Sequence, residues 1–317
     1  MESLGDLLHI WERSPHMKRA EEKKQELLTD PLVTKLREQH PELSDDLIVS
    51  NMNRLSQYVK EYRNCTSCPG LERCPNDLTG HYTMLDVQTV GGSAYLVDSK
   101  VPCRKWTGKQ SQDRIRRRIH SFYVDEHALR GDYSLEQMLR ADRERIKAVE
   151  KVAEYVVHVQ ENGLSKSGLY LYGKFGTGKT FLMCYMLHEL ARHGYSGAIV
   201  YMPDFMEDLK SMFGQPQQLK ETVELLKETD LLVFDDIGAE NLNAWARDHV
   251  LGTILNYRMN RKPTFFTSNY DLDALEQHFS FTNRDGEESH KGQRLMDRVR
   301  PFVEPVAVNG QNKRGMM

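Results

Sequence analysis

A glycine-rich segment at positions 173–180 narrows the folds that this chain can adopt. Its sequence, Gly-Lys-Phe-Gly-Thr-Gly-Lys-Thr, fits the pattern G-x4-G-K-[S/T]. An apolar run at 169–172 precedes it, and a helical pattern over about 179–193 follows it. Glycines let backbone N–H groups turn toward phosphate oxygens, and the start of a helix adds partial positive charge. The segment therefore predicts a phosphate-binding loop between a strand and a helix.

The side chains of this loop have separate expected roles in binding ATP with Mg²⁺. Lys179 is expected to reach the β- and γ-phosphates, and the Thr180 hydroxyl to complete the shell of a magnesium ion. The alternative is a degenerate loop that binds nothing. The predicted nucleotide-binding residues of this segment are Gly173, Gly176, Thr177, Gly178, Lys179, Thr180 and Phe181.

Polar residues at the ends of two further apolar runs predict the rest of a hydrolytic site. Asp235 and Asp236 follow the run at 231–234, and Asn269 follows the run at 264–267. Asp235 is expected to hold the magnesium ion, directly or through water, and Asp236 to orient and deprotonate the attacking water. Asn269 would position the same water, with a plain strand-to-helix cap as the alternative. Together with the phosphate loop, these residues indicate an ATPase.

The apolar runs alternate with helical patterns over the second half of the chain. Residues 198–201 and 302–308 are also predicted strands, and Pro305 favours an edge position for the last one. Continuous apolar strands between helices indicate a parallel sheet that is covered on both faces. Cys184 lies on the apolar face of the helix after the loop and is expected in the core.

Composition limits the remaining possibilities. The chain has 317 residues, 39% of them hydrophobic and 28% charged, which is typical of a soluble protein of about two domains. It has no apolar run of about 18 residues and no basic, apolar leader at its start. We therefore expect a cytoplasmic protein with no membrane contact. The net charge of -3 means that any nucleic-acid contact must come from a local patch.

Four of the five cysteines cluster in the sequence ahead of the ATPase motifs. Clustered thiols in a reducing compartment are typical of metal ligands, and a Cys-x2-Cys pair suits a tetrahedral zinc ion. A site filled by four protein side chains would be structural, whereas buried free cysteines are the alternative. Cys74 and His81 compete for the last position. The five candidates for four zinc ligands are Cys65, Cys68, Cys74, His81 and Cys103.

The chain is predicted to hold two domains joined by a basic linker. Residues 1–110 would form a mainly helical, zinc-binding domain, 111–133 the linker and 134–317 the ATPase domain. Apolar spacing predicts helices over 4–13 and 45–62, the second capped by Ser44, and 134–160 is expected to form one long helix. Seven basic residues and one acid lie within 104–120. This run could meet phosphates or an acidic protein surface, or be a solvated linker.

These motifs carry a resemblance to a known group of proteins. The phosphate loop, the strand ending in Asp235-Asp236 and the pair Ser268-Asn269 resemble those of AAA+ ATPases. Too few residues follow Asn269 for a full helical lid, and this truncation resembles the DnaC/DnaI group of helicase loaders and the related IstB-type transposition helpers. The cysteine-bearing N-terminal part resembles that of the DnaI branch.

The resemblance implies partners and further site residues. In this group the N-terminal domain binds the hexameric replicative DNA helicase, and the AAA+ domain binds ATP and single-stranded DNA and self-associates. Residues 292–298 resemble the group's G-x-R-x-x-D-R segment, whose last arginine reaches the ATP of a neighbouring subunit. Arg298 is therefore the predicted finger, with Arg294 as the alternative. Arg314 resembles the sensor arginine that acts in cis, with Lys313 as its rival.

The function that the resemblance implies is ATP-dependent loading of the replicative helicase onto single-stranded DNA during initiation of replication. Slow hydrolysis is expected, because Asp-Asp replaces the commoner Asp-Glu. Phe213 resembles a position that touches single-stranded DNA, with Lys210 one turn earlier, although core packing is the alternative for Phe213. The competing functions are an IstB-type transposition helper that acts on duplex DNA, and a scaffold that binds ATP without hydrolysing it.

Overall fold

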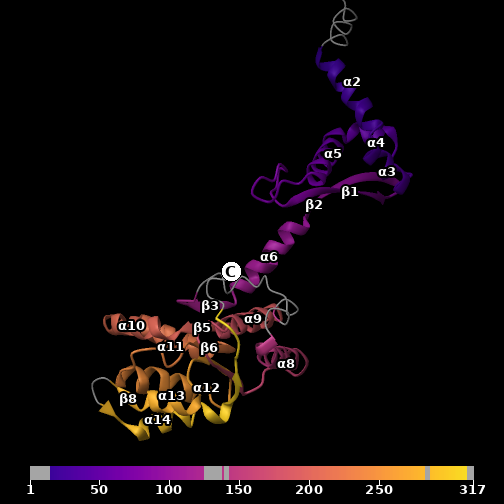
Figure 1. Ribbon diagram of the computed structural model, residues 1–317. Helices are drawn as coiled ribbons and strands as arrows, with labels where there is room; N and C mark the ends of the chain where they lie inside the picture. Colours follow the sequence, from indigo (N-terminus) through magenta and orange to yellow (C-terminus); the bar gives the residue numbers. More distant parts are fainter. Residues whose placement is uncertain (1–14, 125–137, 139–142, 283–285, 313–317) are drawn as a thin grey trace, which may run out of the picture. The chain divides into compact units, whose positions relative to one another are not determined.

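The computed structural model describes residues 15–124, 138, 143–282 and 286–312 of the chain (Figure 1). It divides into two compact units, Met1–Gln112 and Asp113–Met317. The helix expected at 4–13 lies outside the described residues. Within the described ranges, no helix is both long and apolar enough to cross a bilayer.

The first unit combines short helices with a β-hairpin. Its core is formed by apolar side chains of the helices and of the inner face of the hairpin, including Val33, Leu55 and Leu85. The hairpin is antiparallel and turns at Gly91-Gly92, where both glycines have positive φ, as a two-residue hairpin turn requires. The elements in chain order are α2 (Pro15–Leu28), α3 (Pro31–Gln39), α4 (Asp45–Ser50), α5 (Met52–Thr66), β1 (His81–Val90), β2 (Ser93–Pro102) and α6 (Arg104–Arg116).

Two expectations for this unit need correction. The helix expected over 45–62 is divided at Asn51, whose φ of -118° ends α4 before α5 begins, although Ser44 does cap α4 as predicted. Tyr62, at the end of the predicted span, is exposed. In addition, the prediction missed the hairpin: the unit is mainly helical, but alternate residues of β1, such as Leu85 and Val87, are buried against the helices.

The second unit is built on a six-stranded sheet in the order β10-β4-β7-β6-β5-β3, and every neighbouring pair is parallel. Five strands match predicted runs, and the last of these, β10, occupies one edge, as Pro305 predicted. β3 was not expected: the stretch assigned to a linker supplies the other edge strand. The strands are β3 (Ile119–Phe122), β4 (Gly168–Tyr172), β5 (Gly197–Tyr201), β6 (Leu231–Asp235), β7 (Thr264–Ser268) and β10 (Val303–Ala307).

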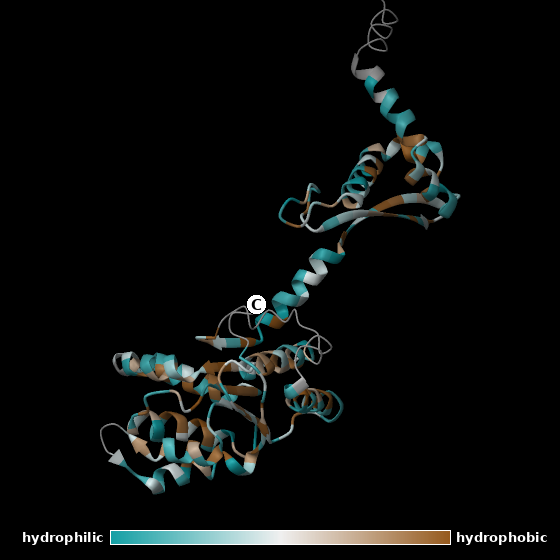
Figure 2. Cartoon of the chain, in the orientation of Figure 1, coloured by the Kyte–Doolittle hydropathy of each residue, from teal (hydrophilic) through white to brown (hydrophobic). Residues whose placement is uncertain are grey.

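Both faces of this sheet are covered, as predicted. Leu231 and Val233 of β6 belong to one buried cluster with α8 and α9, whereas Leu232 and Phe234 belong to a second cluster with α10, α12 and α13. Figure 2 shows the strands as the most hydrophobic part of this unit. Cys184 is fully buried, also as predicted. The main helices are α8 (Ile146–Asn162), α9 (Lys179–Arg192), α10 (Met202–Ser211), α11 (Pro216–Glu228), α12 (Gly252–Arg258), α13 (Leu272–Phe279) and α14 (Ser289–Met296).

The long helix expected over 134–160 is also shorter in the described residues. α8 begins only at Ile146, after a single 3-10 turn at Arg143–Arg145. Part of the expected span, 134–137 and 139–142, lies outside the described residues. α8 ends at Gly163, whose positive φ provides the C-terminal cap.

Candidate nucleotide-binding site

The glycine-rich loop connects β4 to α9, as the sequence predicts. Gly173 and Gly176 have φ values of +143° and +73°, which side-chain-bearing residues rarely adopt. A β-carbon at Gly173 would also lie only 2.5 Å from the carbonyl oxygen of Val308, and one at Gly176 would overlap the Asn312 side chain. The loop therefore needs glycine at both positions, and its backbone N–H groups lie at the start of α9, where anions bind.

Lys179 lies inside the loop. Its side chain is buried, and its ammonium group donates to the carbonyl oxygens of Gly173 and Lys174, each at 2.9 Å, and to Asn269 Oδ1 at 2.8 Å. This holds a positive charge beside the backbone that would surround the phosphates. Phe181, in contrast, packs against the hydrophobic core beneath the loop.

Asp235 and Thr180 are in contact, as a magnesium site requires. The Thr180 hydroxyl and the Thr267 hydroxyl both bond to the Asp235 carboxyl group, the second at 2.6 Å. Burial raises the pKa of Asp235 to about 6, although these two bonds act in the opposite direction. A divalent cation next to this carboxyl group would favour its charged form. A buried carboxylate beside a hydroxyl is therefore a donor set that fits Mg²⁺.

Asn269 connects Lys179 to Asp236. Its Nδ2 donates to Asp236 Oδ1 at 2.9 Å, while its Oδ1 accepts from Lys179. Asp236 itself has a φ of +55°, and its backbone N–H donates to the Thr267 hydroxyl at 2.8 Å. Such a conformation costs roughly 1 kcal/mol or more for a non-glycine residue, and here the neighbouring strand holds it. The tips of β4, β6 and β7 thus bring the predicted catalytic side chains into one network.

The predicted arginines are not part of this network. The Arg298 guanidinium donates to Asn256 Oδ1 and to the carbonyl oxygen of Arg294 within its own unit, and it is partly exposed. The Arg294 side chain is exposed. Arg314 and its rival Lys313 lie outside the described residues.

The two residues predicted to contact DNA are Lys210 and Phe213. Lys210 is exposed at the end of α10, but its ammonium group pairs with Glu207 at 2.7 Å, which offsets its charge. Phe213 lies in a short 3-10 turn, Met212–Gly214, and its side chain is outside the described part of the structure.

Arg145 is a neighbour of the loop that sequence reasoning missed. Its side chain is buried, and its Nη1 lies 3.5 Å from the carbonyl oxygen of Thr177. The same nitrogen lies next to Gly178, where a β-carbon would come within 2.6 Å of it. No pattern distinguishes this residue in the sequence, because it is one of several charges ahead of α8.

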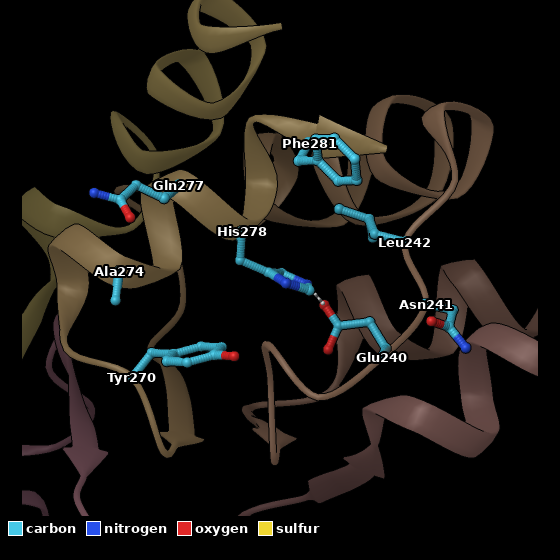
Figure 3. Close-up of a pocket in the computed structure, with 8 residues that line it drawn as sticks. All are labelled: Glu240, Asn241, Leu242, Tyr270, Ala274, Gln277, His278 and Phe281. Carbon is cyan, nitrogen blue, oxygen red and sulfur yellow. Dashed lines mark hydrogen bonds and ion pairs between the residues drawn. The ribbon is translucent and has the colours of Figure 1, made fainter. Parts of the chain in front are cut away.

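A separate open cavity of about 370 Å³ lies beside the segments that follow β6 and β7. Figure 3 shows His278 pointing toward Glu240 at its centre, with a distance of 3.1 Å between Nε2 and Oε1. Tyr270 and Phe281 are exposed at the cavity. None of the predicted site residues lines it, although Tyr270 directly follows Asn269.

The four clustered cysteines lie within the first unit: Cys65 in the last turn of α5, Cys68 and Cys74 between α5 and β1, and Cys103 directly before α6. The Trp106 backbone N–H donates to Cys103 Sγ at 3.4 Å, that of Gly80 donates to Cys74 Sγ at 3.5 Å, and the Asn76 side chain lies 3.5 Å from Cys65 Sγ. Across the described residues, however, no three metal-binding side chains are grouped closely enough to hold an ion. The zinc assignment therefore stays a prediction.

The fold and the site together define a P-loop, ATP-binding domain of the AAA+ type. Residues 106–315 match the family described as IstB-like ATP binding protein, and residues 1–90 match the family described as primosomal protein DnaI N-terminus. Over 317 residues the chain is 34% identical to the replicative helicase loader DnaI of Bacillus subtilis (strain 168), covering 99% of both chains. The chain belongs to the DnaI family of replicative helicase loaders.

Solved structures agree with this assignment. A crystal structure of DnaI is 35% identical and covers 63% of this chain and 100% of its own, with a TM-score of 0.52. A putative primosome component from Streptococcus pyogenes serotype M3 is 30% identical and covers 63% of this chain and 98% of its own, with a TM-score of 0.50.

Proposed function

We propose that this chain is an ATP-dependent loader that places the hexameric replicative DNA helicase onto single-stranded DNA during initiation of replication. The end-to-end similarity to the Bacillus subtilis loader carries the proposal, because it spans both units rather than the ATPase unit alone. In this proposal the first unit binds the helicase. The second unit binds ATP and changes its affinity for DNA.

The ATPase chemistry follows from the network around Lys179. Backbone N–H groups of the loop and the Lys179 ammonium would bind the phosphates, and Thr180 and Asp235 would hold Mg²⁺, which supplies charge neutralisation when bound. Asp236 would take the proton of the attacking water, which Asn269 helps to orient. The Asn269 bond holds Asp236 in place but also shares its oxygen, which is consistent with slow turnover.

Self-association would complete this site. The Arg298 guanidinium has no part in the network of its own chain, and it is partly exposed on the segment that follows α14. A guanidinium from a neighbouring subunit would stabilise the charge that develops on the transferred phosphoryl group. We therefore propose that Arg298 acts in trans, after the AAA+ units associate. Arg314 would act in cis.

A second candidate function is an ATPase that assembles on duplex DNA as a transposition helper. The match of residues 106–315 to the IstB-like family favours it. The separate match of residues 1–90 to the DnaI N-terminus disfavours it. Preference for duplex over single-stranded DNA in a direct competition would support this second candidate.

The test of the loader is reconstitution with a purified hexameric helicase of the DnaI-dependent type. The full chain with ATP should co-elute with the helicase and increase the amount of helicase bound to circular single-stranded DNA. The absence of a stable complex at micromolar concentrations of both proteins would remove the partner assignment, whatever the ATPase activity.

We also propose that the first unit binds one structural Zn²⁺. N–H groups of Asn76, Gly80 and Trp106 lie within 3.5 Å of the Sγ atoms of Cys65, Cys74 and Cys103, and contacts of this kind are typical around metal ligands. The Gly70 N–H has the largest effect on the pKa of Cys68 and lowers it; burial opposes this, and the Lys105 ammonium lowers the pKa further. These donors support the proposal by their chemistry. In the proposal, binding of the metal would bring the ligand atoms to coordinating distance of one another.

His81 remains the rival of Cys74 for the fourth position, and its surroundings also suit a metal ligand. Its Nδ1 lies 3.0 Å from the carbonyl oxygen of Thr79, which can only accept a hydrogen bond. Nδ1 must therefore carry the proton, and Nε2 is left as the basic nitrogen. This is the usual second contact of a metal-bound histidine.

The zinc proposal predicts a selective loss of structure. Cys68→Ser should lower the zinc content from about one ion per chain to near zero and unfold the first unit, because structural zinc contributes directly to folding. ATP binding by the second unit should stay within about threefold of normal, since the units have separate cores. Metal analysis and nucleotide titration of the same sample measure both effects.

The matched pair His81→Ala and Cys74→Ser decides the fourth ligand. Zinc loss in the first variant and normal zinc in the second would support His81. A wild-type chain without zinc, or loss of ATP binding together with zinc, would contradict the proposal.

A further inference from the structure

α6 is polar over most of its surface. Figure 2 shows it as mainly hydrophilic along its length, and Ile115 is its one buried hydrophobic residue among those described. A helix of this kind gains little from core packing, so its sequence must be explained by its surroundings or its function. With the turn that follows it, it carries the basic residues Arg104, Lys105, Lys109, Arg114, Arg116, Arg117 and Arg118 against the single acid Asp113.

Within the described residues, none of these seven basic side chains pairs with a carboxylate. Two of the seven have a polar neighbour: the Lys105 ammonium lies 3.4 Å from Cys68 Sγ, whose pKa it helps to lower, and Arg118 donates to the carbonyl oxygen of Ala191. Like charges one turn apart on a helix destabilise it by a few tenths of a kcal/mol per pair. Stability of the fold therefore does not account for the basic residues.

One face of α6 presents its charges in a row. Lys105, Lys109, Gln112 and Arg116 follow the spacing i, i+4, i+7, i+11, which places them on one side of a helix, and all four are exposed. At 1.5 Å per residue, the row extends about 16 Å along the helix axis. Successive phosphates of a nucleic-acid strand are several ångströms apart, so a row of this length spans two or three of them.

Because the rest of the chain is acidic, α6 and the turn after it are the main region that attracts a polyanion. The whole chain has a net charge of -3, although 104–118 is strongly positive, so the remainder is acidic. A polyanion is therefore repelled by most of the molecule and attracted to α6 and the turn after it. Attraction of this kind acts over about a Debye length and weakens with salt.

Nucleic acid fits this surface better than an acidic protein does. Protein interfaces depend on apolar or aromatic side chains at their centre, with charges at the rim. None of the exposed large hydrophobic residues of the described chain lies within 104–118. A surface of cations without an apolar anchor is typical of binding to the phosphate backbone without base recognition.

We propose that α6, through the face formed by Lys105, Lys109, Gln112 and Arg116, binds the phosphate backbone of single-stranded DNA. The inference rests on the proposed function for the choice of single-stranded DNA. It adds a contact outside the AAA+ unit's own predicted DNA residues, on the helix that directly follows the cysteine cluster.

The test is the salt dependence of DNA binding by the full chain. The variant Lys109→Gln/Arg116→Gln removes two of the proposed bonds to phosphate. Removal of each bond should reduce the slope of log K against log salt concentration by about 0.7 for a single strand, so we expect a reduction of about 1.4. The reduction should be the same for oligo-dT and for a mixed-sequence strand, because the backbone and not the bases is bound. Fluorescence anisotropy of labelled strands at several salt concentrations measures it.

The matched control is Lys147→Gln/Lys220→Gln. Both lysines are exposed and lie on other helices, and the change in net charge is the same. The control should keep the wild-type slope. An unchanged slope in the α6 variant, or an equal fall in the control, would overturn the inference.

Two further readouts separate this inference from the proposed function. The α6 variant should co-elute with the helicase as the wild type does; loss of helicase binding with an unchanged DNA slope would make α6 a protein contact and overturn the inference. A wild-type chain that binds the helicase but no DNA also overturns it and leaves the partner assignment intact. If the α6 variant shows the expected reduction in slope but the wild-type chain does not bind the helicase, the DNA contact of α6 is supported and only the loader function is removed.

Discussion

Replacing Lys179 with alanine is expected to lower the affinity of the chain for ATP by about 100-fold or more. Hydrogen bonds to charged groups contribute about 1.5–3 kcal/mol each, and Lys179 would bond to two phosphates. At 1.4 kcal/mol per factor of ten, the loss is at least two orders of magnitude. Titration with a fluorescent ATP analogue in the presence of Mg²⁺ measures it.

The neighbouring loop lysine provides the control. Lys174 is exposed, and its carbonyl oxygen rather than its side chain contacts Lys179. Lys174→Ala should therefore change ATP affinity by less than about threefold. Normal affinity in Lys179→Ala would contradict the nucleotide site on which the whole functional assignment depends.

The ATPase fold could be predicted from the sequence because its signals are local. The strands of the sheet are continuous apolar runs, and the glycines of the loop are required by its backbone, as the positive φ of Gly176 shows. Asp235, Asp236 and Asn269 could be placed together because parallel strands end at one edge of a sheet. The bonds from Asn269 to Lys179 and Asp236 follow from that topology.

The N-terminal unit and the first strand of the second unit were harder to predict because their signals are weak or non-local. β2 is exposed at most of its positions, so its sequence has little of the alternation that marks a half-buried strand. β3 has only four residues and follows a basic run, and its strand character comes from pairing with β5. The break at Asn51 interrupts an apolar stripe that is regular on both sides. In each case tertiary contacts decide what the local pattern leaves open.

The position of Arg145 shows the same limit within the site. It reaches the loop from a segment that precedes β4 by more than twenty residues, through packing of α8 against α9. Neither spacing nor composition carries that information. The residues of the loop can be recognised from the local sequence, whereas residues that contact the loop from distant segments are determined only by the fold.

Replacing Asp236 with asparagine is expected to abolish multiple-turnover ATP hydrolysis while leaving ATP binding within about threefold of normal. The amide oxygen of the new side chain can still accept from Asn269 Nδ2, so the network at the tips of β6 and β7 is kept. What is lost is the base that takes a proton from water, which is typically a contribution of 10²–10⁴-fold, about 3–5 kcal/mol. Phosphate release under saturating ATP and Mg²⁺ measures the loss.

Asp235→Asn is the matched comparison, because it removes the neighbouring carboxylate but keeps its shape. Asp235 bonds to Thr180 and Thr267 rather than to Asn269. Its loss should therefore reduce the gain in ATP affinity that Mg²⁺ gives, and it should also reduce the rate of hydrolysis. Helicase binding by Asp236→Asn with ATP should persist, since only the chemical step is removed. If the wild-type chain releases no phosphate beyond the Asp236→Asn variant in the presence of helicase and single-stranded DNA, ATP acts by binding alone and the chain is a nucleotide-gated scaffold.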